Sequence, residues 1–230
     1  MEGTTAVVTG GSRGIGASVA RRFASEGAYV VVCARSDGTL SSVVDDIEAD
    51  GGHVTGLRAD VRDEFDVERL MEVAAREGDG IDLVVAGAGV YHGTPGNTPL
   101  VEEAYSVFDD HLRTNGRGVY AAVREAVPHL NDGARILVPS GAVARDPKQG
   151  YGSYAVSKAF AEALARQFAV ELDAAVGVVD PGTVDTDLTG GVGRDPDDVA
   201  GLFHWAAADA PTEDLDGGVL DLKAWKRATR

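Results

Sequence analysis

Short apolar runs that alternate with longer amphipathic stretches constrain the fold of this 230-residue chain more than any other feature. The runs are rich in Val, Ile and Leu and are mostly continuous, which is typical of strands covered on both faces of a parallel sheet. Between them, stretches such as 16–27 and 159–172 carry apolar residues at the spacing of one helix face. The apolar runs are 5–9, 28–34, 53–59, 81–87, 134–140, 174–180 and 218–222.

This alternation predicts an α/β fold: a single-domain, Rossmann-like, doubly wound sheet of about seven parallel strands with helices on both faces. No low-complexity linker, internal repeat or break in composition divides the chain, so we expect residues 1–230 to form one domain. The one cysteine, Cys33, excludes an internal disulfide framework, and we expect no metal site. No apolar run reaches membrane-spanning length and no basic, apolar leader is present, so we expect a cytoplasmic protein.

The formal net charge is −16, and the acidic residues are scattered along the chain. A diffuse negative surface repels nucleic acid and anionic membranes, so we expect neither as a partner. Asp outnumbers Glu 24 to 13, and Arg outnumbers Lys 17 to 4. Simple solubility would explain the acidity, and a GC-rich genome would explain the arginines. We favour adaptation to high salt, in which the Debye length falls to about 3 Å at 1 M and like charges stop repelling one another.

A glycine-rich stretch, TGGSRGIG from Thr9 to Gly16, follows the first apolar run and precedes a helical pattern. Glycines let the backbone turn tightly and approach a pyrophosphate, and the following helix offers that anion free N–H groups and its positive end. A glycine-rich turn without a ligand is the alternative. The strand–turn–helix–strand context within 34 residues favours a dinucleotide-binding loop.

Tyr154 and Lys158 are four residues apart, so on a helix they share one face. The ordinary pKa of tyrosine, about 10, is too high for proton transfer at neutral pH, and a nearby cation lowers it. A broad planar guanidinium would not take the position of a compact ammonium, so we expect the lysine at 158 to resist replacement in this arginine-rich chain. The alternative, a solvent-facing helical pair, gives no reason to avoid arginine.

The glycine spacing G-x-x-x-G-x-G together with Tyr154-x-x-x-Lys158 resembles the short-chain dehydrogenase/reductase family. Further segments resemble the family in order: ADV (59–61), the helix around Asn115, and DPGTVDTDL (180–188). The resemblance implies an oxidoreductase that transfers a hydride between a nicotinamide cofactor and a small-molecule carbonyl or secondary alcohol. It implies four catalytic residues, namely Asn115, Ser140, Tyr154 and Lys158. It implies cofactor contacts from Gly10, Ser12, Arg13, Gly14, Ile15, Gly16, Arg35, Asp60, Val61, Ala86, Gly87, Ala88, Tyr154, Lys158, Pro181, Gly182, Val184 and Thr186.

In these roles Tyr154 donates the proton and Lys158 lowers its pKa and holds the nicotinamide ribose. Ser140 polarises the carbonyl, and Asn115 holds a water that links Lys158 to solvent. Asp60 contacts the adenine base. These roles are implied by the resemblance alone.

Two departures from the family pattern stand out. Ser140 precedes Tyr154 by 14 residues, whereas the usual separation of 13 leads to Gly141. Either the loop 144–152 carries one extra residue, which we favour, or the serine is displaced. The stretch AGAG at 86–89 also replaces the usual Asn-Asn-Ala-Gly. These departures support an alternative function, a cofactor-binding module with little or no turnover. An epimerase or dehydratase of the superfamily is disfavoured, because such relatives usually carry a longer substrate domain.

The end of the second apolar run bears on the choice of cofactor. A carboxylate there would bind the ribose of NAD, but the position is Ala34. Arg35 and Arg13 can instead hold a 2′-phosphate, so we expect NADP(H) to be favoured over NAD(H). The alternative pairs both arginines with acids such as Asp37.

The substrate region is expected to be small. A short glycine-rich lid at about 187–198 is predicted to cover an open or small pocket. Apolar residues beyond one face of the helix at 154–172 favour a homodimer or homotetramer. Tyr91, His92, Tyr151 and Leu188 are the candidates for the pocket wall.

Overall fold

The seven apolar runs form the seven strands of one sheet in the computed structural model, which describes residues 1–230. Every strand pair is parallel, and the order is β3-β2-β1-β4-β5-β6-β7. The prediction of a doubly wound, Rossmann-like sheet is therefore confirmed. The strands are β1 Thr5–Thr9, β2 Tyr29–Ala34, β3 His53–Arg58, β4 Ile81–Ala86, β5 Leu130–Pro139, β6 Ala175–Asp180 and β7 Val219–Asp221.

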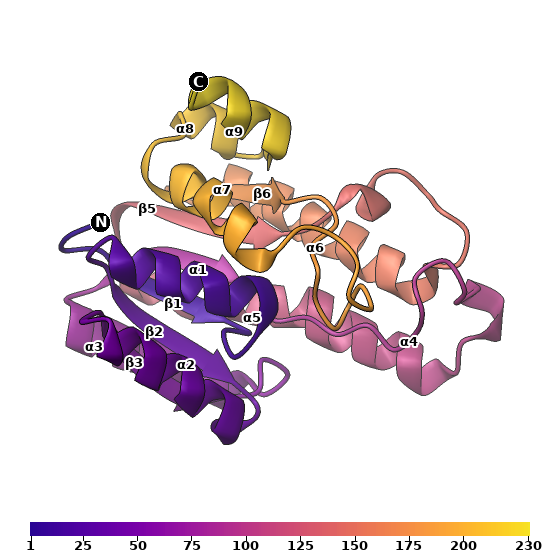
Figure 1. Cartoon of the computed structure of the whole chain (residues 1–230), viewed down its shortest axis with the longest axis horizontal. Coiled ribbons are helices and arrows are strands. Elements are labelled where there is room, and N and C mark those ends of the chain that lie inside the picture. The colour runs from indigo at the N-terminus through magenta and orange to yellow at the C-terminus, as the bar shows by residue number, and fades with distance from the viewer.

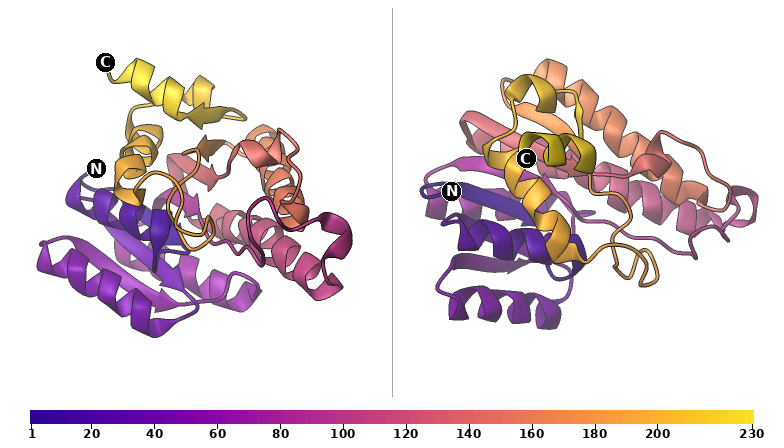
Figure 2. Two further views of the ribbon diagram at one scale, coloured as in Figure 1. Left: turned by 45° about the vertical axis from the view of Figure 1, so that its right-hand side comes forward. Right: turned by 45° about the horizontal axis from the view of Figure 1, so that its top comes forward.

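Helices cover both faces of the sheet (Figures 1 and 2). α1, α2 and α7 contribute buried residues to a core of 26 residues on one face, and α3, α5 and α6 to a core of 25 on the other. The two cores are nearly equal, which explains why the strands are continuously apolar. The helices are α1 Gly14–Ser25, α2 Asp37–Ala49, α3 Glu64–Gly78, α4 Tyr105–His111, α5 Gly118–Ala126, α6 Gly152–Glu171, α7 Pro196–Ala208, α8 Thr212–Leu215 and α9 Leu222–Ala228.

Two elements begin earlier than the sequence pattern indicates. β5 starts at Leu130 rather than at 134, because Leu130 pairs with Ile81 before the register shifts around Gly133, whose φ is +78°. A polar, glycine-containing start of this kind has no apolar pattern. α6 starts at Gly152, two residues before the start of the predicted helix at 154–172, and it includes Tyr154 and Lys158 in one continuous helix. This continuous helix confirms that the two side chains lie one helical turn apart.

The strand order reverses between β1 and β4, and ligands of open α/β sheets bind at the carboxyl edge beside such a reversal. The loop between β6 and α7 lies beyond the arrowheads of the central strands (Figures 1 and 2). A cavity of about 1160 Å³ opens at this edge, and the loops after β1, β4, β5 and β6 all contribute to its wall.

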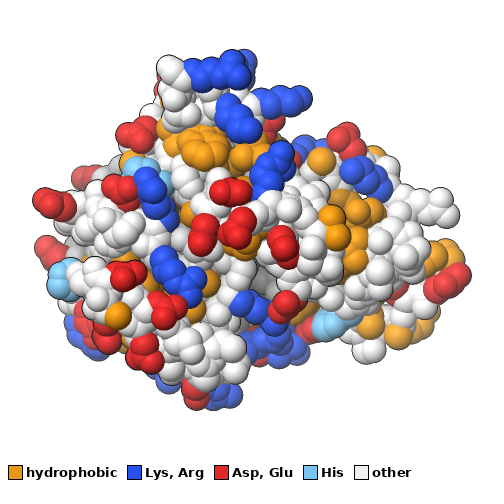
Figure 3. Space-filling model, in the orientation of Figure 1, with side chains coloured by type: hydrophobic (Ala, Val, Ile, Leu, Met, Phe, Trp, Pro, Cys, Tyr) orange, Lys and Arg blue, Asp and Glu red, His pale blue; other side chains and the backbone are white.

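Charged side chains of both signs are interspersed over the face seen in Figure 3. No helix combines the length and the apolar character that a membrane span requires. No cluster of three or more histidine, cysteine or acidic side chains could hold a metal ion.

Candidate active site

The glycine loop between β1 and α1 forms one wall of the cavity. Gly10 has φ +74°, and a Cβ there would lie 2.7 Å from the Ala88 Cα, so only glycine fits. α1 begins at Gly14 without a side-chain cap and without an acidic residue in its first turn. Its first N–H groups and its positive end are therefore available to an anion. Ser12, Arg13, Ile15 and Gly16 also border the cavity.

The AGAG stretch after β4 is held from the neighbouring strand. The Thr9 hydroxyl accepts a hydrogen bond of 3.2 Å from the Ala88 backbone N–H. Thr9 is itself 1% exposed, so this bond is shielded from water. A threonine on β1 therefore ties down a segment that lacks the asparagine side chains of the family pattern. Ala86 is buried, while Gly87 and Ala88 border the cavity.

Tyr154 and Lys158 project from α6 into the same cavity. The Lys158 ammonium donates a 2.9 Å hydrogen bond to the Pro139 carbonyl oxygen and none to the Tyr154 hydroxyl. Burial lowers the pKa of Lys158 to about 8, although the Glu162 carboxylate acts in the opposite direction. Burial, with smaller contributions from Tyr91 and Tyr151, raises the pKa of Tyr154 to about 12.

The expectation that the ammonium lowers the Tyr154 pKa is therefore not met by this arrangement. The physical reason is that the ammonium is directed to a backbone carbonyl while the phenol is surrounded by other rings. The phenol consequently keeps its proton at neutral pH, which suits a proton donor better than a base.

Asn115 lies in a π-helical turn, Leu112–Arg117, between α4 and α5, and is 1% exposed. Its Oδ1 accepts from the Val90 N–H (2.8 Å), and its Nδ2 donates to the Val90 carbonyl and to Ser157 Oγ (both 2.9 Å). Both Nδ2 hydrogens and one of the two Oδ1 lone pairs are thus engaged in fixing Val90 to α6, so the side chain has no free donor for a water.

Ser140 follows the end of β5 and borders the cavity together with Gly141. The Ser140 hydroxyl is buried and has no hydrogen-bond partner. A Cβ built on Gly141 would meet nothing within 4 Å, so that position faces open space. A buried hydroxyl without a partner needs an explanation, and a bound substrate oxygen would supply one.

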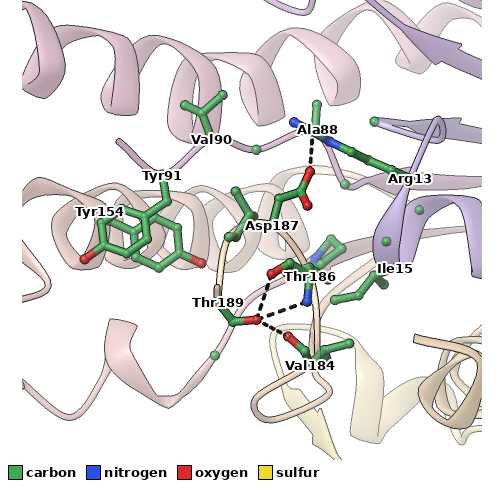
Figure 4. Close-up of a pocket in the computed structure, with 18 of the residues that line it drawn as sticks. Arg13, Ile15, Ala88, Val90, Tyr91, Tyr154, Val184, Thr186, Asp187 and Thr189 are labelled. Carbon is green, nitrogen blue, oxygen red and sulfur yellow. Dashed lines mark hydrogen bonds and ion pairs between the residues drawn. The ribbon is translucent and has the colours of Figure 1, made fainter. Parts of the chain in front are cut away.

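The two arginines expected near a 2′-phosphate both border the cavity. The Arg13 guanidinium forms a 2.5 Å ion pair with Asp187, an acid of the loop after β6 (Figure 4). Its partner is therefore not Asp37. The exposed Arg35 side chain forms no ion pair or hydrogen bond and remains available to a ligand.

Asp60 is engaged elsewhere, whereas its neighbours Ala59 and Val61 border the cavity. Both Asp60 carboxylate oxygens accept from Arg62, which also pairs with Asp110 at 2.7 Å. Burial alone would raise the pKa of Asp60, but the hydrogen bonds from Arg62 outweigh it and the net shift is downward. A base contact by the Asp60 carboxylate stays a prediction, and it would have to compete with Arg62.

The segment after β6 closes the cavity from the other side. Pro181, Gly182, Val184 and Thr186 all border it. The Thr189 hydroxyl donates to the Val184 carbonyl (2.6 Å) and accepts from the Thr186 N–H (3.0 Å), which folds the loop back on itself (Figure 4). The predicted lid therefore has a defined shape, and its last three residues, 196–198, belong to α7.

Aromatic side chains line the substrate end. The rings of Tyr91 and Tyr154 are stacked with centroids 4.5 Å apart (Figure 4). Tyr151 and Leu188 border the cavity as expected. His92 does not border the cavity, because its ring points to Asp110, with Nε2 2.6 Å from the carboxylate.

The sequence analysis did not identify two sets of polar side chains that support the site. Arg145 contacts both Glu162 of α6 and Asp180 at the end of β6, so it joins three segments of the cavity wall. Glu162 follows Lys158 by four residues, and that spacing could have revealed it. His111 and Ser153 form a second buried pair with a hydrogen bond of 2.6 Å, and no local spacing connects them.

The chain matches known proteins over most of its length. The family model for short chain dehydrogenase matches residues 4–197. A short chain dehydrogenase/reductase, AacuN, of Aspergillus aculeatus is 36% identical over 82% of this chain and 72% of the relative. The 3beta-hydroxysteroid dehydrogenase 1 of Eggerthella lenta is 32% identical over 95% of this chain and 94% of its own length.

Solved structures of dehydrogenases show the same similarity. A dehydrogenase/reductase from Sinorhizobium meliloti superposes with a TM-score of 0.86 at 34% identity, covering 96% of this chain and 94% of that one. A short chain dehydrogenase from Burkholderia cenocepacia, solved in complex with NADP, gives a TM-score of 0.86 at 30% identity, covering 97% of each chain.

The fold and the comparisons thus define an α/β oxidoreductase. The chain belongs to the short-chain dehydrogenase/reductase family, whose members bind nicotinamide cofactors. Its own residues fit such a group: the glycine loop borders the cavity, and the uncapped start of α1 offers free N–H groups to the same space.

Proposed function

We propose that this protein is an NADP-dependent oxidoreductase acting on a carbonyl or secondary alcohol. The observation that carries the proposal is the meeting of Tyr154, Lys158 and the uncapped glycine loop in one cavity. When bound, the nicotinamide supplies or accepts the hydride. The protein then has to bind and orient the reactants and to move one proton.

Tyr154 is proposed as the proton donor in the reducing direction. Its hydroxyl gives a proton to the substrate oxygen as the carbonyl carbon gains the hydride, which balances the two-electron reduction to an alcohol. With its pKa raised to about 12, the phenol is protonated at neutral pH and so acts there as a donor and not as a base. The Lys158 ammonium would stabilise the phenolate that remains and bind the ribose.

Ser140 is proposed to donate a hydrogen bond to the substrate oxygen. Support comes from its hydroxyl, which borders the cavity and has no partner in the protein. A preorganised donor of this kind stabilises negative charge as it develops on the oxygen. Asn115 is proposed to support the site by fixing Val90.

NADP(H) is the proposed cofactor because the chain has no acid at Ala34 and keeps Arg35 unpaired beside the cavity. NADP and NADPH are present in the solved relatives from Burkholderia cenocepacia and from a metagenomic library, the latter 28% identical. A planar guanidinium can bind the 2′-phosphate of NADP(H) through two hydrogen bonds, and NAD(H) has no phosphate at that position.

A binding module with little turnover is the second candidate, favoured by one observation. Gly141 stands at the usual serine spacing and faces open space, so the family's hydroxyl is missing from that position. A module of this kind would bind NADPH tightly without oxidising it.

Absorbance at 340 nm with NADPH and a panel of aliphatic, aromatic and polycyclic ketones tests the proposal. We expect ketone-dependent loss of absorbance in the parent and a loss of at least about a hundredfold in Tyr154→Phe. The exposed Tyr105→Phe serves as the matched control. Full activity in Tyr154→Phe would overturn the mechanism, and tight NADPH binding without turnover of any ketone would favour the module.

We also propose a homo-oligomer in a saline environment. Apolar side chains on α5 and α6, namely Tyr120, Val156, Phe160 and Val170, are between 41% and 78% exposed and would be covered by a second copy. The net charge of −16 supports the high-salt part of the proposal. Sedimentation at low and at multimolar salt tests both.

A further inference from the structure

His111 is the most completely buried titratable side chain near the site, with 0% exposure, and the proposed mechanism does not use it. Its Nε2 accepts a 2.9 Å hydrogen bond from the His92 backbone N–H, and its Nδ1 lies 2.6 Å from Ser153 Oγ. A backbone N–H can only donate, so Nε2 carries no proton. The ring is therefore neutral, with its proton on Nδ1 and directed at Ser153.

The contacts of His111 repeat those of Asn115 four residues later. Asn115 joins Val90, which directly follows the AGAG segment, to Ser157 of α6. His111 joins His92 to Ser153 of the same helix. We call these the Asn115 set and the His111 set. They are spaced by four residues on each helix and by two along the segment after β4, so they run side by side.

Tyr91 lies between the two fixed residues, Val90 and His92. Its backbone is thus held on both sides, and its ring is stacked on the Tyr154 ring at 4.5 Å (Figure 4). The His111 ring lies 5.8 Å from Tyr91 and 6.2 Å from Tyr154, the latter edge-on. The rings of Tyr91, His111 and Tyr154 thus pack against one another. In addition, Ser153, which is hydrogen-bonded to His111, directly precedes Tyr154 in the chain.

We propose that His111 is a positioning residue of the active site: in its neutral form it fixes the Tyr91 segment to α6 and so holds the Tyr154 phenol in its donating position. This inference rests on the proposed function, since it assumes that Tyr154 donates the proton. Protonation of His111 would place a hydrogen on Nε2, where the His92 N–H already points. The His111 set would break and the Tyr91 ring would lose its support.

The groups around the His111 ring determine how readily it is protonated. His92 faces the ring from the segment after β4, with centroids 5.2 Å apart, while Glu103 lies on the segment before α4 and Asp110 on α4 itself. Burial first, and His92 second, lower the pKa of His111, whereas the two carboxylates oppose them. The net shift is downward from 6.5, so the neutral form prevails at neutral pH and is lost only on the acid side of that value.

Three variants test the proposal. His111→Phe keeps a ring but removes both hydrogen bonds. His111→Gln offers an amide that can still donate and accept but does not titrate in this range. His53→Gln, at the exposed start of β3, is the matched control.

We expect His111→Phe to lower kcat about tenfold to a hundredfold, since small displacements of a reacting group have effects of this size, with little change in the KM for NADPH. The parent should lose kcat below pH 6.5, with a limb that His53→Gln retains and His111→Gln lacks. Ser153→Ala, which removes the acceptor of the Nδ1 proton, gives a second measurement should His111→Phe fail to fold.

A parent-like kcat and an unchanged acid limb in both His111→Gln and Ser153→Ala, with NADPH binding intact, would overturn the positioning role. The outcome is separable from failure of the proposed function. Full activity in Tyr154→Phe removes the basis of the whole mechanism, whereas an inactive Tyr154→Phe beside unaffected His111 variants refutes this inference alone.

Discussion

The Arg13–Asp187 ion pair across the cavity provides a graded test of cofactor choice. If Arg13 binds the 2′-phosphate, Asp187 competes for it. The two side chains are 64% and 69% exposed, so their 2.5 Å pair contributes only about 0.2–1 kcal/mol. Asp187→Asn should then tighten NADPH binding by about 1.4- to 5-fold and leave NADH binding unchanged. Removing a negative charge beside the phosphate acts in the same direction.

Arg35→Ala should have the opposite and larger effect, because Arg35 has no competing acid. Loss of a charge-assisted hydrogen bond of about 1.5–3 kcal/mol predicts NADPH binding weaker by about 10- to 150-fold. Titration of the reduced nicotinamide fluorescence with both cofactors at one salt concentration measures these changes. Asp46→Asn, which breaks the Arg21–Asp46 pair on the surface between α1 and α2, is the control. Equal losses for NADPH and NADH in Arg35→Ala, or weaker NADPH binding in Asp187→Asn, would refute the reasoning.

Other predictions concern the catalytic groups and the surface. Ser140→Ala should lower kcat about a hundredfold or more if this hydroxyl donates to the substrate oxygen; an unchanged Ser140→Ala together with a gain in Gly141→Ser would instead assign the role to position 141. Glu162 raises the pKa of Lys158, so Glu162→Gln should lower that pKa below about 8 and move the alkaline limb of the pH–rate profile to lower pH. The control is Arg166→Gln, whose contact with Glu162 is 3.8 Å and which should leave that limb unchanged. Raising KCl from about 0.1 M to about 3 M should raise the Tm, and a falling Tm would contradict high-salt adaptation.

The parts of the structure that the sequence predicts are those in which local pattern and burial agree. The runs at 5–9 and 81–87 are buried from both faces, so their continuous apolar character marks them as strands. The Tyr154–Lys158 pair was identifiable because helical spacing alone brings the two side chains together. β5 begins outside its apolar run because pairing of Leu130 with Ile81, a contact far apart in sequence, decides where it starts.

Local sequence patterns cannot predict the contacts that support the site, because each contact joins residues from different elements. Val90 and Asn115 are 25 positions apart, and His111 and Ser153 are 42 apart. The orientation of Lys158 is decided in the same way, by its hydrogen bond to the carbonyl of Pro139, the last residue of β5. A side chain with several donors on one nitrogen can bind that carbonyl and still offer hydrogens to a ribose, whereas the donors of a guanidinium are spread over a plane. The retention of lysine at 158 thus has a geometric cause, which predicts that Lys158→Arg, although it keeps the charge, loses activity nearly as completely as Lys158→Met.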